Sequence, residues 1–325
     1  MPNGLLLIDK PAGLRSAACV ALVKRRLPAK AGHAGTLDST ASGLLIVLLG
    51  TATRCSDYVM RLPKVYEAVV RLGVSTDTCD ASGECIFRGD TSKVDERAFD
   101  RVLCSFLGTR MQVPPGISAL KVNGRAAHRA ARAGEELKLD ARPVAVAAVR
   151  RSSPLADGRA KITVACGKGT YIRAIARDIG TRLGCGAHVE ALRRLSIGPF
   201  HVSEACAPEA AAIQRLLPVR AVGSVFQRVL LNADAERRLT NGLAVPLSEA
   251  GRYVPGTLPL ESGLCVEGGA GQGGAAQGGT AQGGAALFGF AGLDGNFLLR
   301  PQTNILDAAE TGNETAPTTG AGDPR

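Results

Sequence analysis

The sequence predicts an α+β protein of about two domains. Short apolar or β-branched runs typical of strands are mixed with amphipathic helical segments, without strict alternation of the two. The length of 325 residues corresponds to about two domains at roughly 150 residues each. Because 45% of the residues are hydrophobic, the chain can bury a sizeable core.

The first 72 residues predict strands and helices in mixed order. A helical pattern begins after Ser16 and stops at Pro28, since proline ends a helix, and Thr51 is expected to cap a helix that runs to about Met60. Residues 30–43 are expected to form a loop. Three apolar or β-branched runs predict strands at residues 5–8, 44–49 and 65–72.

Two amphipathic helices and two strands are expected next. A helix is expected to follow Thr91 and Ser92 and to end at Gly108. Its apolar residues at helical spacing predict one buried face: Phe99, Val102, Leu103 and Phe106. The runs at 144–149 and 162–165 are typical of strands. An apolar stripe over 172–183 then predicts a helix that Gly184 ends.

Two segments near the C-terminus are expected to lack fixed structure, because they offer little apolar surface to bury. They are the Gly/Ala/Gln repeat at 268–284 and the tail at 307–325. Between them, the Asp294-Gly295 pair has apolar residues on both sides, which predicts a β-hairpin. We therefore expect a first domain at 1–220 and a small β domain at 229–306 that the repeat interrupts.

Composition argues against several classes of protein. No apolar run approaches the roughly 20 residues of a membrane span, and residues 5–8 are too short for a signal-peptide core, so we expect a cytoplasmic protein. The nine cysteines form no CxxC pair, which argues against a zinc knuckle or a disulfide framework. Residues 166–170 depart from the phosphate-loop pattern, and no metalloprotease, serine-hydrolase or dinucleotide motif occurs.

Positive charge is concentrated in the first two-thirds of the chain. Residues 221–325 contain six Lys and Arg against ten Asp and Glu, whereas residues 1–220 contain 33 against 19. A surplus of +14 fits a polyanionic partner, and RNA is the natural one in the cytosol. Solubility alone is the simpler explanation.

The segment GHAGTLD at 32–38 carries the clearest chemical signal. Its two glycines let the backbone turn closely around a ligand, while it presents one histidine and one carboxylate. The residues alone leave two interpretations open. Asp38 is either a carboxylate placed for chemistry or a cap of the next element.

Seven segments occur in an order and spacing that one known family shares. They are LIDKPAGL at 7–14, GHAGTLD at 32–38 followed by SGLL at 42–45, KVYEA at 64–68, PP at 114–115 with SALKVNG at 118–124, RPV at 142–144, KGTYIRAIARDIG at 168–180 and LRRLSIGPF at 192–200. Over residues 3–200 the chain resembles the TruB-type tRNA pseudouridine synthases, which isomerise uridine 55 in the T-arm of tRNA.

The resemblance implies a fold and a reaction. The fold is a mixed sheet with flanking helices and a central catalytic cleft, with an RNA-gripping insertion at about 112–143. FGFAGLDGNFLLRP at 288–301 resembles part of a PUA-like β domain. The reaction is isomerisation of uridine to pseudouridine by base flipping and a single aspartate, without cofactor or metal. We expect a monomer whose partner is the tRNA T-arm.

Three residues match the catalytic positions of the family. Asp38 is the implied catalytic carboxylate, which could attack C1′, add at C6 or remove the 2′ proton. Tyr66 matches a tyrosine that stacks on the uracil and lies where the C5 proton leaves. Arg173 matches an arginine that pairs with the aspartate. Taken singly, the three could equally be a turn cap, a strand aromatic and a solvated helix arginine.

Further residues are expected to bind the RNA. Tyr171 and Leu192 match positions that contact the base, and His33 matches a residue that fills the space of the flipped nucleotide. Basic side chains complete the set, either beside the pocket or along the stem: Lys64, Lys121, Arg125, Arg129, Arg132, Arg193 and Arg194.

The chain departs from the family pattern in three places. Ser39-Thr40 stand where members commonly carry Pro-Leu, aromatic residues are usual at Ile117 and His128, and the 268–284 repeat has no counterpart that we know. Two rival functions stay open. A tRNA-binding chaperone needs no carboxylate in a basic groove, and a hydrolytic glycosylase needs a second carboxylate to activate water, which is not evident.

Overall fold

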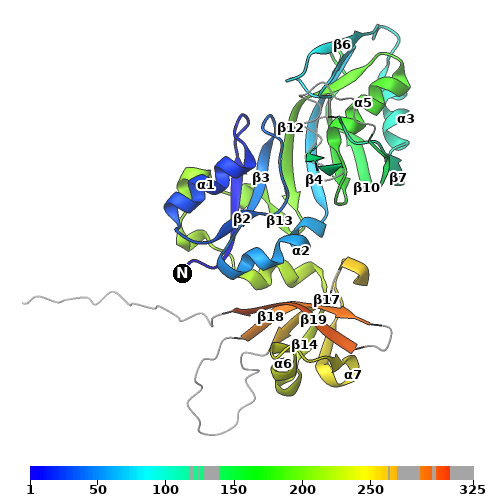
Figure 1. Ribbon diagram of the computed structural model, residues 1–325. Helices are drawn as coiled ribbons and strands as arrows, with labels where there is room; N and C mark the ends of the chain where they lie inside the picture. The colour runs from blue at the N-terminus through cyan, green and yellow to red at the C-terminus, as the bar shows by residue number, and fades with distance from the viewer. Residues whose placement is uncertain are drawn as a thin grey trace, which may run out of the picture. The chain divides into compact units, whose positions relative to one another are not determined.

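The computed structural model describes residues 1–116, 121–122, 125–126, 139–262, 264–268, 286–294 and 298–307. The chain forms two compact units, Met1–Val225 and Phe226–Arg325, and each is built on its own sheet (Figure 1). Helices and strands are mixed in both, so the predicted α+β class is confirmed. Within the described residues, no helix has the length and hydropathy that a membrane span requires.

A nine-stranded mixed sheet forms the first unit. Its strands are Gly4–Lys10 (β1), Ala31–His33 (β2), Ser42–Leu49 (β3), Lys64–Leu72 (β4), Gly108–Gln112 (β7), Arg142–Arg151 (β10), Arg159–Cys166 (β11), Ala187–Ile197 (β12) and Phe200–His201 (β13). The order along the sheet is β1-β3-β12-β4-β11-β10-β7, with β2 beside β3 and β13 beside β12. Only β12 and β3 pair in parallel. The central strand β12 therefore joins two antiparallel parts of the sheet.

Two short hairpins accompany this sheet. One joins Val74–Thr76 (β5) to Cys85–Arg88 (β6), and the other joins Lys121–Val122 (β8) to Arg125–Ala126 (β9). The second hairpin lies in the insertion at 112–143, and nothing further is described for most of that insertion.

Helices cover the sheet and bury its apolar side chains. They are Ser16–Arg26 (α1), Ser56–Arg61 (α2), Glu96–Cys104 (α3) and Ile172–Leu183 (α5), with 3₁₀ turns at Gly50–Cys55, Val202–Glu204, Pro208–Ala210, Ile213–Arg215 and Val219–Val225. α1 packs its valines against β1 and β3, whereas α3 and α5 pack against β4, β11 and β12. Two cores thus form on either side of the central strand.

The second unit is a six-stranded sheet with two short helices. Its strands are Gln227–Leu231 (β14), Val245–Pro246 (β15), Gly251–Val254 (β16), Leu264–Gly268 (β17), Ala286–Leu293 (β18) and Leu298–Asp307 (β19), in the order β15-β19-β18-β17-β14-β16. Its helices are Ala233–Thr240 (α6) and Leu247–Ala250 (α7), with a 3₁₀ turn at Leu260–Ser262. β18 and β19 pair antiparallel, as the predicted hairpin requires. Residues 269–284 and 308–325 lie outside the described residues.

Most predicted elements are present, and three expectations are wrong. Thr51 caps no helix, because its hydroxyl donates to Asn3 Oδ1 at 2.9 Å and the turn begins at Gly50. The expected loop at 30–43 contains β2. Gly108 begins β7 instead of ending a helix, and α3 begins after Asp95, whose carboxylate accepts from the third backbone N–H.

Candidate active site

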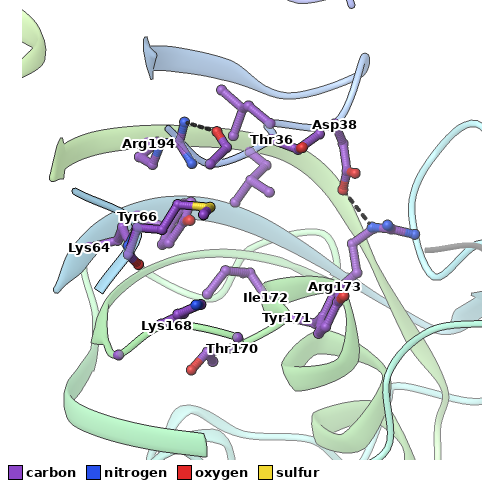
Figure 2. A pocket seen from close by; sticks show the side chains of 16 residues that line it. Thr36, Asp38, Lys64, Tyr66, Lys168, Thr170, Tyr171, Ile172, Arg173 and Arg194 are labelled. Atoms are coloured by element: carbon purple, nitrogen blue, oxygen red, sulfur yellow. Dashed lines mark hydrogen bonds and ion pairs between the residues drawn. The ribbon is translucent and has the colours of Figure 1, made fainter. Parts of the chain in front are cut away.

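A pocket of about 310 Å³ opens in the first unit beside the central strands. It lies where the loop after β2, the start of β4, the β11–α5 loop and β12 come together. Its lining residues are Gly35, Thr36, Leu37, Asp38, Met60, Lys64, Tyr66, Gly167, Lys168, Gly169, Thr170, Tyr171, Ile172, Arg173, Leu192 and Arg194 (Figure 2). Three of the segments that carry the family resemblance therefore meet here with GHAGTLD.

The loop that carries Asp38 is fixed by the segment between β1 and α1. Ser16 Oγ donates to the carbonyl of Leu37 at 2.8 Å and accepts from its N–H at 3.0 Å. The buried Lys10 ammonium donates to the carbonyl of Ser39 at 3.4 Å. Leu37 and Ser39, the two neighbours of Asp38, are thus held by hydrogen bonds to residues at the ends of β1 and α1. These bonds keep the position of Asp38 well defined.

Arg173, in the first turn of α5, holds the Asp38 carboxylate. Its Nε donates to Asp38 Oδ2 at 2.8 Å, and its Nη1 donates to the carbonyl of Thr78 at 2.9 Å (Figure 2). The Arg173 side chain is 6% exposed, whereas that of Asp38 is 41% exposed. The arginine therefore orients the carboxylate and leaves it open to a ligand.

Asp80 is a second carboxylate at Arg173, and sequence analysis missed it. Its Oδ2 lies 3.8 Å from Arg173 Nε, and its other oxygen accepts from Thr78 and Ser82 hydroxyls. Burial acts to raise the pKa of the Asp80 carboxyl, but those hydrogen bonds and the Arg173 charge hold it below its ordinary value. Asp80 therefore stays ionised and helps to fix the arginine that holds Asp38.

Tyr66 and Leu192 lie on neighbouring strands that both line the pocket. Tyr66 is on β4 and Leu192 on β12, which pair antiparallel. Tyr171 reaches the pocket from the end of the β11–α5 loop, where its backbone exchanges hydrogen bonds of 2.9 and 3.1 Å with the Gln112 side chain. These three side chains give the pocket an apolar wall suited to a flat ring.

Lys64 lies deep beside Tyr66. Its ammonium donates to the carbonyls of Met60 at 2.5 Å and Leu62 at 2.6 Å. Burial, with the nearby Arg194 charge, lowers the pKa of Lys64 to about 8. The side chain is only 6% exposed, so the ammonium is held by the protein and is not displayed to solvent.

Other predicted residues lie outside the pocket. His33 is on β2, where it pairs with Val47, and its buried Nδ1 has no partner among the described residues. Arg193 makes an ion pair of 2.8 Å with Asp9. Lys121 is on β8, and its side chain is not among the described ones. The same holds for Arg125, and Arg129 and Arg132 lie outside the described residues, as do Ile117 and His128.

Arg194 lies beside the pocket, as one of its lining residues, but it is only 1% exposed. A side chain buried in this way cannot hold the RNA stem, so that part of the expectation is wrong. The doubled Arg193-Arg194 sequence gave no sign of this difference. Alternation along a strand sends the two side chains to opposite faces, which a prediction of β12 would have revealed.

Among the described residues, no group of three His, Cys, Asp or Glu side chains could hold a metal ion. The pocket offers one accessible carboxylate, two phenols and four cationic side chains. Such a site can supply a nucleophile or base, a stacking ring and a proton acceptor.

Comparison with known proteins identifies the family. Residues 23–172 match the model of the N-terminal domain of TruB family pseudouridylate synthases, and residues 173–235 match that of the tRNA pseudouridylate synthase B C-terminal domain. The chain is 43% identical over 254 residues to tRNA pseudouridine synthase B of Thermobifida fusca, covering 74% of this chain and 86% of that protein. The chain belongs to the TruB family of pseudouridylate synthases.

Other relatives and solved structures agree with this membership. The TruB family chain is 42% identical over 259 residues to tRNA pseudouridine synthase B of Aromatoleum aromaticum, covering 77% of this chain and 83% of that protein. A chain in the crystal structure of a Cbf5-Nop10-Gar1 complex matches with a TM-score of 0.64 and 26% identity, over 82% of this chain and 75% of that one. The predicted pseudouridine-synthase fold and enzyme class are confirmed.

Proposed function

We propose that this enzyme isomerises uridine 55 in the T-arm of tRNA to pseudouridine, with Asp38 as its single catalytic carboxylate. The observation that carries the proposal is the Asp38–Arg173 ion pair of 2.8 Å at the mouth of a pocket that also holds Tyr66. The homologous proteins named above are tRNA pseudouridine synthases B, which supports tRNA as the substrate.

The reaction needs no oxidant and no second substrate. The bond between C1′ and N1 breaks, a bond between C1′ and C5 forms, C5 loses a proton, and N1 gains one. Because the atoms and electrons balance within the nucleotide, side chains alone can carry the chemistry. Asp38 is the exposed carboxylate of the pocket, and it can act on C1′, on C6 or on the 2′ proton.

Arg173 and Tyr66 supply the other two functions. Arg173 orients the Asp38 carboxylate at the pocket, because its Nε donates a hydrogen bond to Oδ2 of that carboxylate. Tyr66 offers a ring for stacking on uracil and an oxygen that can receive the C5 proton. Leu192 and Tyr171 close the apolar sides of the pocket around the base.

Base flipping follows from the position of Asp38. The carboxylate lies at a pocket lined by residues of the sheet and its loops, and C1′ of a stacked nucleotide cannot enter such a pocket. The nucleotide must therefore leave its stack, at a cost of a few kcal/mol that phosphate contacts offset. The +14 surplus of residues 1–220 supplies those contacts.

The test uses a T-arm stem-loop and a full tRNA transcript, each with uridine or cytidine at position 55. Carbodiimide marking of pseudouridine should give one product site, at position 55, in both uridine substrates and none in the cytidine substrates. Release of free uracil would show a glycosylase instead. Product at another position only would overturn the T-arm assignment.

A further inference from the structure

Arg194 lies on β12, between its two neighbouring strands β3 and β4. In the parallel pair of β12 and β3, Arg194 is opposite Gly43, and in the antiparallel pair of β12 and β4 it is directly opposite Tyr66. Directly opposed residues have side chains on the same face of a sheet and close together. Arg194 and Tyr66 therefore approach each other from adjacent strands at the pocket (Figure 2).

The guanidinium of Arg194 makes a fork of hydrogen bonds. Its Nε donates to the carbonyl of Leu44 at 2.7 Å, and its Nη2 donates to the carbonyl of Gly35 at 3.1 Å. Gly35 begins the turn that leads to Asp38. One arginine thus joins β3 to the catalytic loop, a geometry that a lysine ammonium cannot reproduce because it lacks the planar fork.

Tyr66 is the third group at this guanidinium. Arg194 is directly opposite Tyr66 across the strand pair, and its guanidinium acts to lower the pKa of the Tyr66 phenol by its charge and by hydrogen bonding. Because guanidinium only donates, the phenolic oxygen must be the acceptor. This arrangement favours the form of the phenol that can take up a proton.

Titratable and charged groups from several elements surround Tyr66. Burial raises the pKa of the Tyr66 phenol, Arg194 on β12 lowers it, and Cys166 on β11 and Asp38 on its loop raise it. Lys64, two residues along β4, and Lys168 also line the pocket. Arg194 is therefore the chief group that opposes the effect of burial on this phenol.

A buried arginine of this kind is costly to the fold. Its side chain is 1% exposed, and within the described part of the chain no carboxylate lies within 4 Å of it. Burying a cation without a carboxylate partner is unfavourable. A cost of that kind at a pocket is typical of a functional role.

We propose that Arg194 is a positioning residue of the isomerisation, which holds the Tyr66 oxygen as proton acceptor and sets its place relative to the Asp38 loop. The inference rests on the proposed function. When the C5 proton passes to the Tyr66 oxygen, the electron pair of the C5–H bond returns to the ring as the C5–C6 double bond. Tyr66 starts as the phenol and gives its own proton to N1, which gains one in the reaction, and Arg194 stabilises the phenolate that then receives the C5 proton.

The first experiment titrates Tyr66 directly. The chain has no Trp and four Tyr, so tyrosinate absorbance is easily followed, and the difference between wild type and Tyr66→Phe isolates the Tyr66 contribution. In Arg194→Met this contribution should move to higher pH, whereas Arg194→Lys should keep it near wild type. Arg159→Met is the matched control, because Arg159 is half exposed and pairs with Glu190 away from the pocket. An unchanged titration in Arg194→Met overturns the proposal.

The second experiment measures single-turnover rates on tRNA over a range of pH. Arg194→Met should lose on the order of 10²-fold in rate, with its pH profile moved in the same direction as the titration and the tRNA Kd within about threefold of wild type. Arg194→Lys should keep the wild-type pH profile but lose about tenfold in rate, because the fork is gone. If Arg194→Met does not fold, the lysine variant decides. A wild-type rate in Arg194→Lys would show that the two hydrogen bonds of the guanidinium fork are not needed, which contradicts the proposal.

A double variant separates positioning from general damage. In a Tyr66→Phe background, Arg194→Met should lower the rate by no more than about threefold, because the two residues act through one step. A full additional loss would contradict the proposal. If the Tyr66 titration moves as expected but wild type forms no pseudouridine, the proposed function fails while the Arg194–Tyr66 coupling stands.

Discussion

Side chains of the pocket divide into an exposed carboxylate and buried groups that hold it. Asp38 is 41% exposed, and its partner Arg173 is 6% exposed. Arg173 is itself fixed by the carbonyl of Thr78 and by Asp80. The buried charges therefore orient the Asp38 carboxylate, which stays accessible at the pocket.

Tyr66→Phe should separate stacking from proton transfer. The ring and its contacts stay, so the tRNA Kd should change by no more than about threefold, whereas product formation should slow by about 10²-fold or more. Quench-flow single turnover with excess enzyme measures the chemical step. A rate equal to that of wild type would remove the hydroxyl from the mechanism.

Lys64 should make the free energy of unfolding depend on pH. Its pKa is lowered from 10.5 to about 8 in the fold, so between these values the unfolded chain binds more protons than the folded chain. The stability that this lowered pKa contributes to the free energy of unfolding is therefore fully present above pH 10.5, and it is lost as the pH falls through about 8.

Denaturant unfolding of wild type and Lys64→Met across that window measures the effect. The stability difference should move in favour of wild type as the pH rises, by on the order of 1 kcal/mol per pH unit. Lys161→Met is the control, because Lys161 is 52% exposed and should give a constant difference. A constant difference for Lys64→Met would contradict the lowered pKa.

Sequence reasoning found the proposed catalytic residues of the pocket but not the groups that support them. Asp38, Tyr66 and Arg173 stand in recognisable segments, and they meet as expected. Asp80 has no such pattern, because its role depends on the β5–β6 hairpin bringing it to Arg173. The burial of Arg194 was missed because it depends on which face of β12 the side chain takes.

Strand pairing at β12 places the site, and it depends on one glycine. Gly43 has φ +104°, and a Cβ there would overlap the backbone of Arg194 on β12. A side chain at this position would be strained by its backbone conformation and would also push the two parallel strands apart.

Gly43→Ala should therefore lower the free energy of unfolding of the first unit by more than about 3 kcal/mol. Gly13→Ala is the matched control, since Gly13 has φ +87° and a Cβ added there would meet no atom within 4 Å, so it should cost only about 1 kcal/mol. Thermal and urea unfolding compare the two. Equal losses would show that backbone conformation alone matters and that close approach of β12 does not.

Local patterns predicted the strands and helices that carry an apolar or β-branched run or a regular apolar stripe. β1, β3, β4 and α5 all have such patterns, and α5 ends at Gly184 with φ +74°, as expected. The central strand β12 was not predicted, because AHVEALRRLSI carries charged residues that a buried strand normally lacks. Its place between β3 and β4 comes from long-range pairing, which no local pattern records.

The chain as a whole combines a basic first unit with a second unit interrupted by the Gly/Ala/Gln repeat. The repeat joins β17 to β18, which pair antiparallel, so their facing ends need only a short connection. Residues 269–284 contain no charge for RNA and almost no apolar surface to bury.

Replacing residues 269–284 by a short Asn-Gly turn should leave activity unchanged and stability equal or slightly higher. Shortening a loop changes closure entropy slowly, by about 0.6 kcal/mol per doubling of length. The melting temperature and steady-state kinetics on a T-arm stem-loop and on full tRNA are the measurements. A loss on full tRNA alone would show that the repeat contributes to recognition outside the T-arm.

Conversion of uridine 55 by the Asp38→Asn variant most directly tests the proposal that Asp38 is the catalytic carboxylate. The variant should bind tRNA within a few-fold of wild type, because no phosphate contact is lost, and it should form no pseudouridine under single-turnover conditions. Asp57→Asn, at an exposed position in α2, is the control and should match wild type. Isomerisation by Asp38→Asn at a rate near that of wild type would contradict the assignment of Asp38 as the catalytic carboxylate.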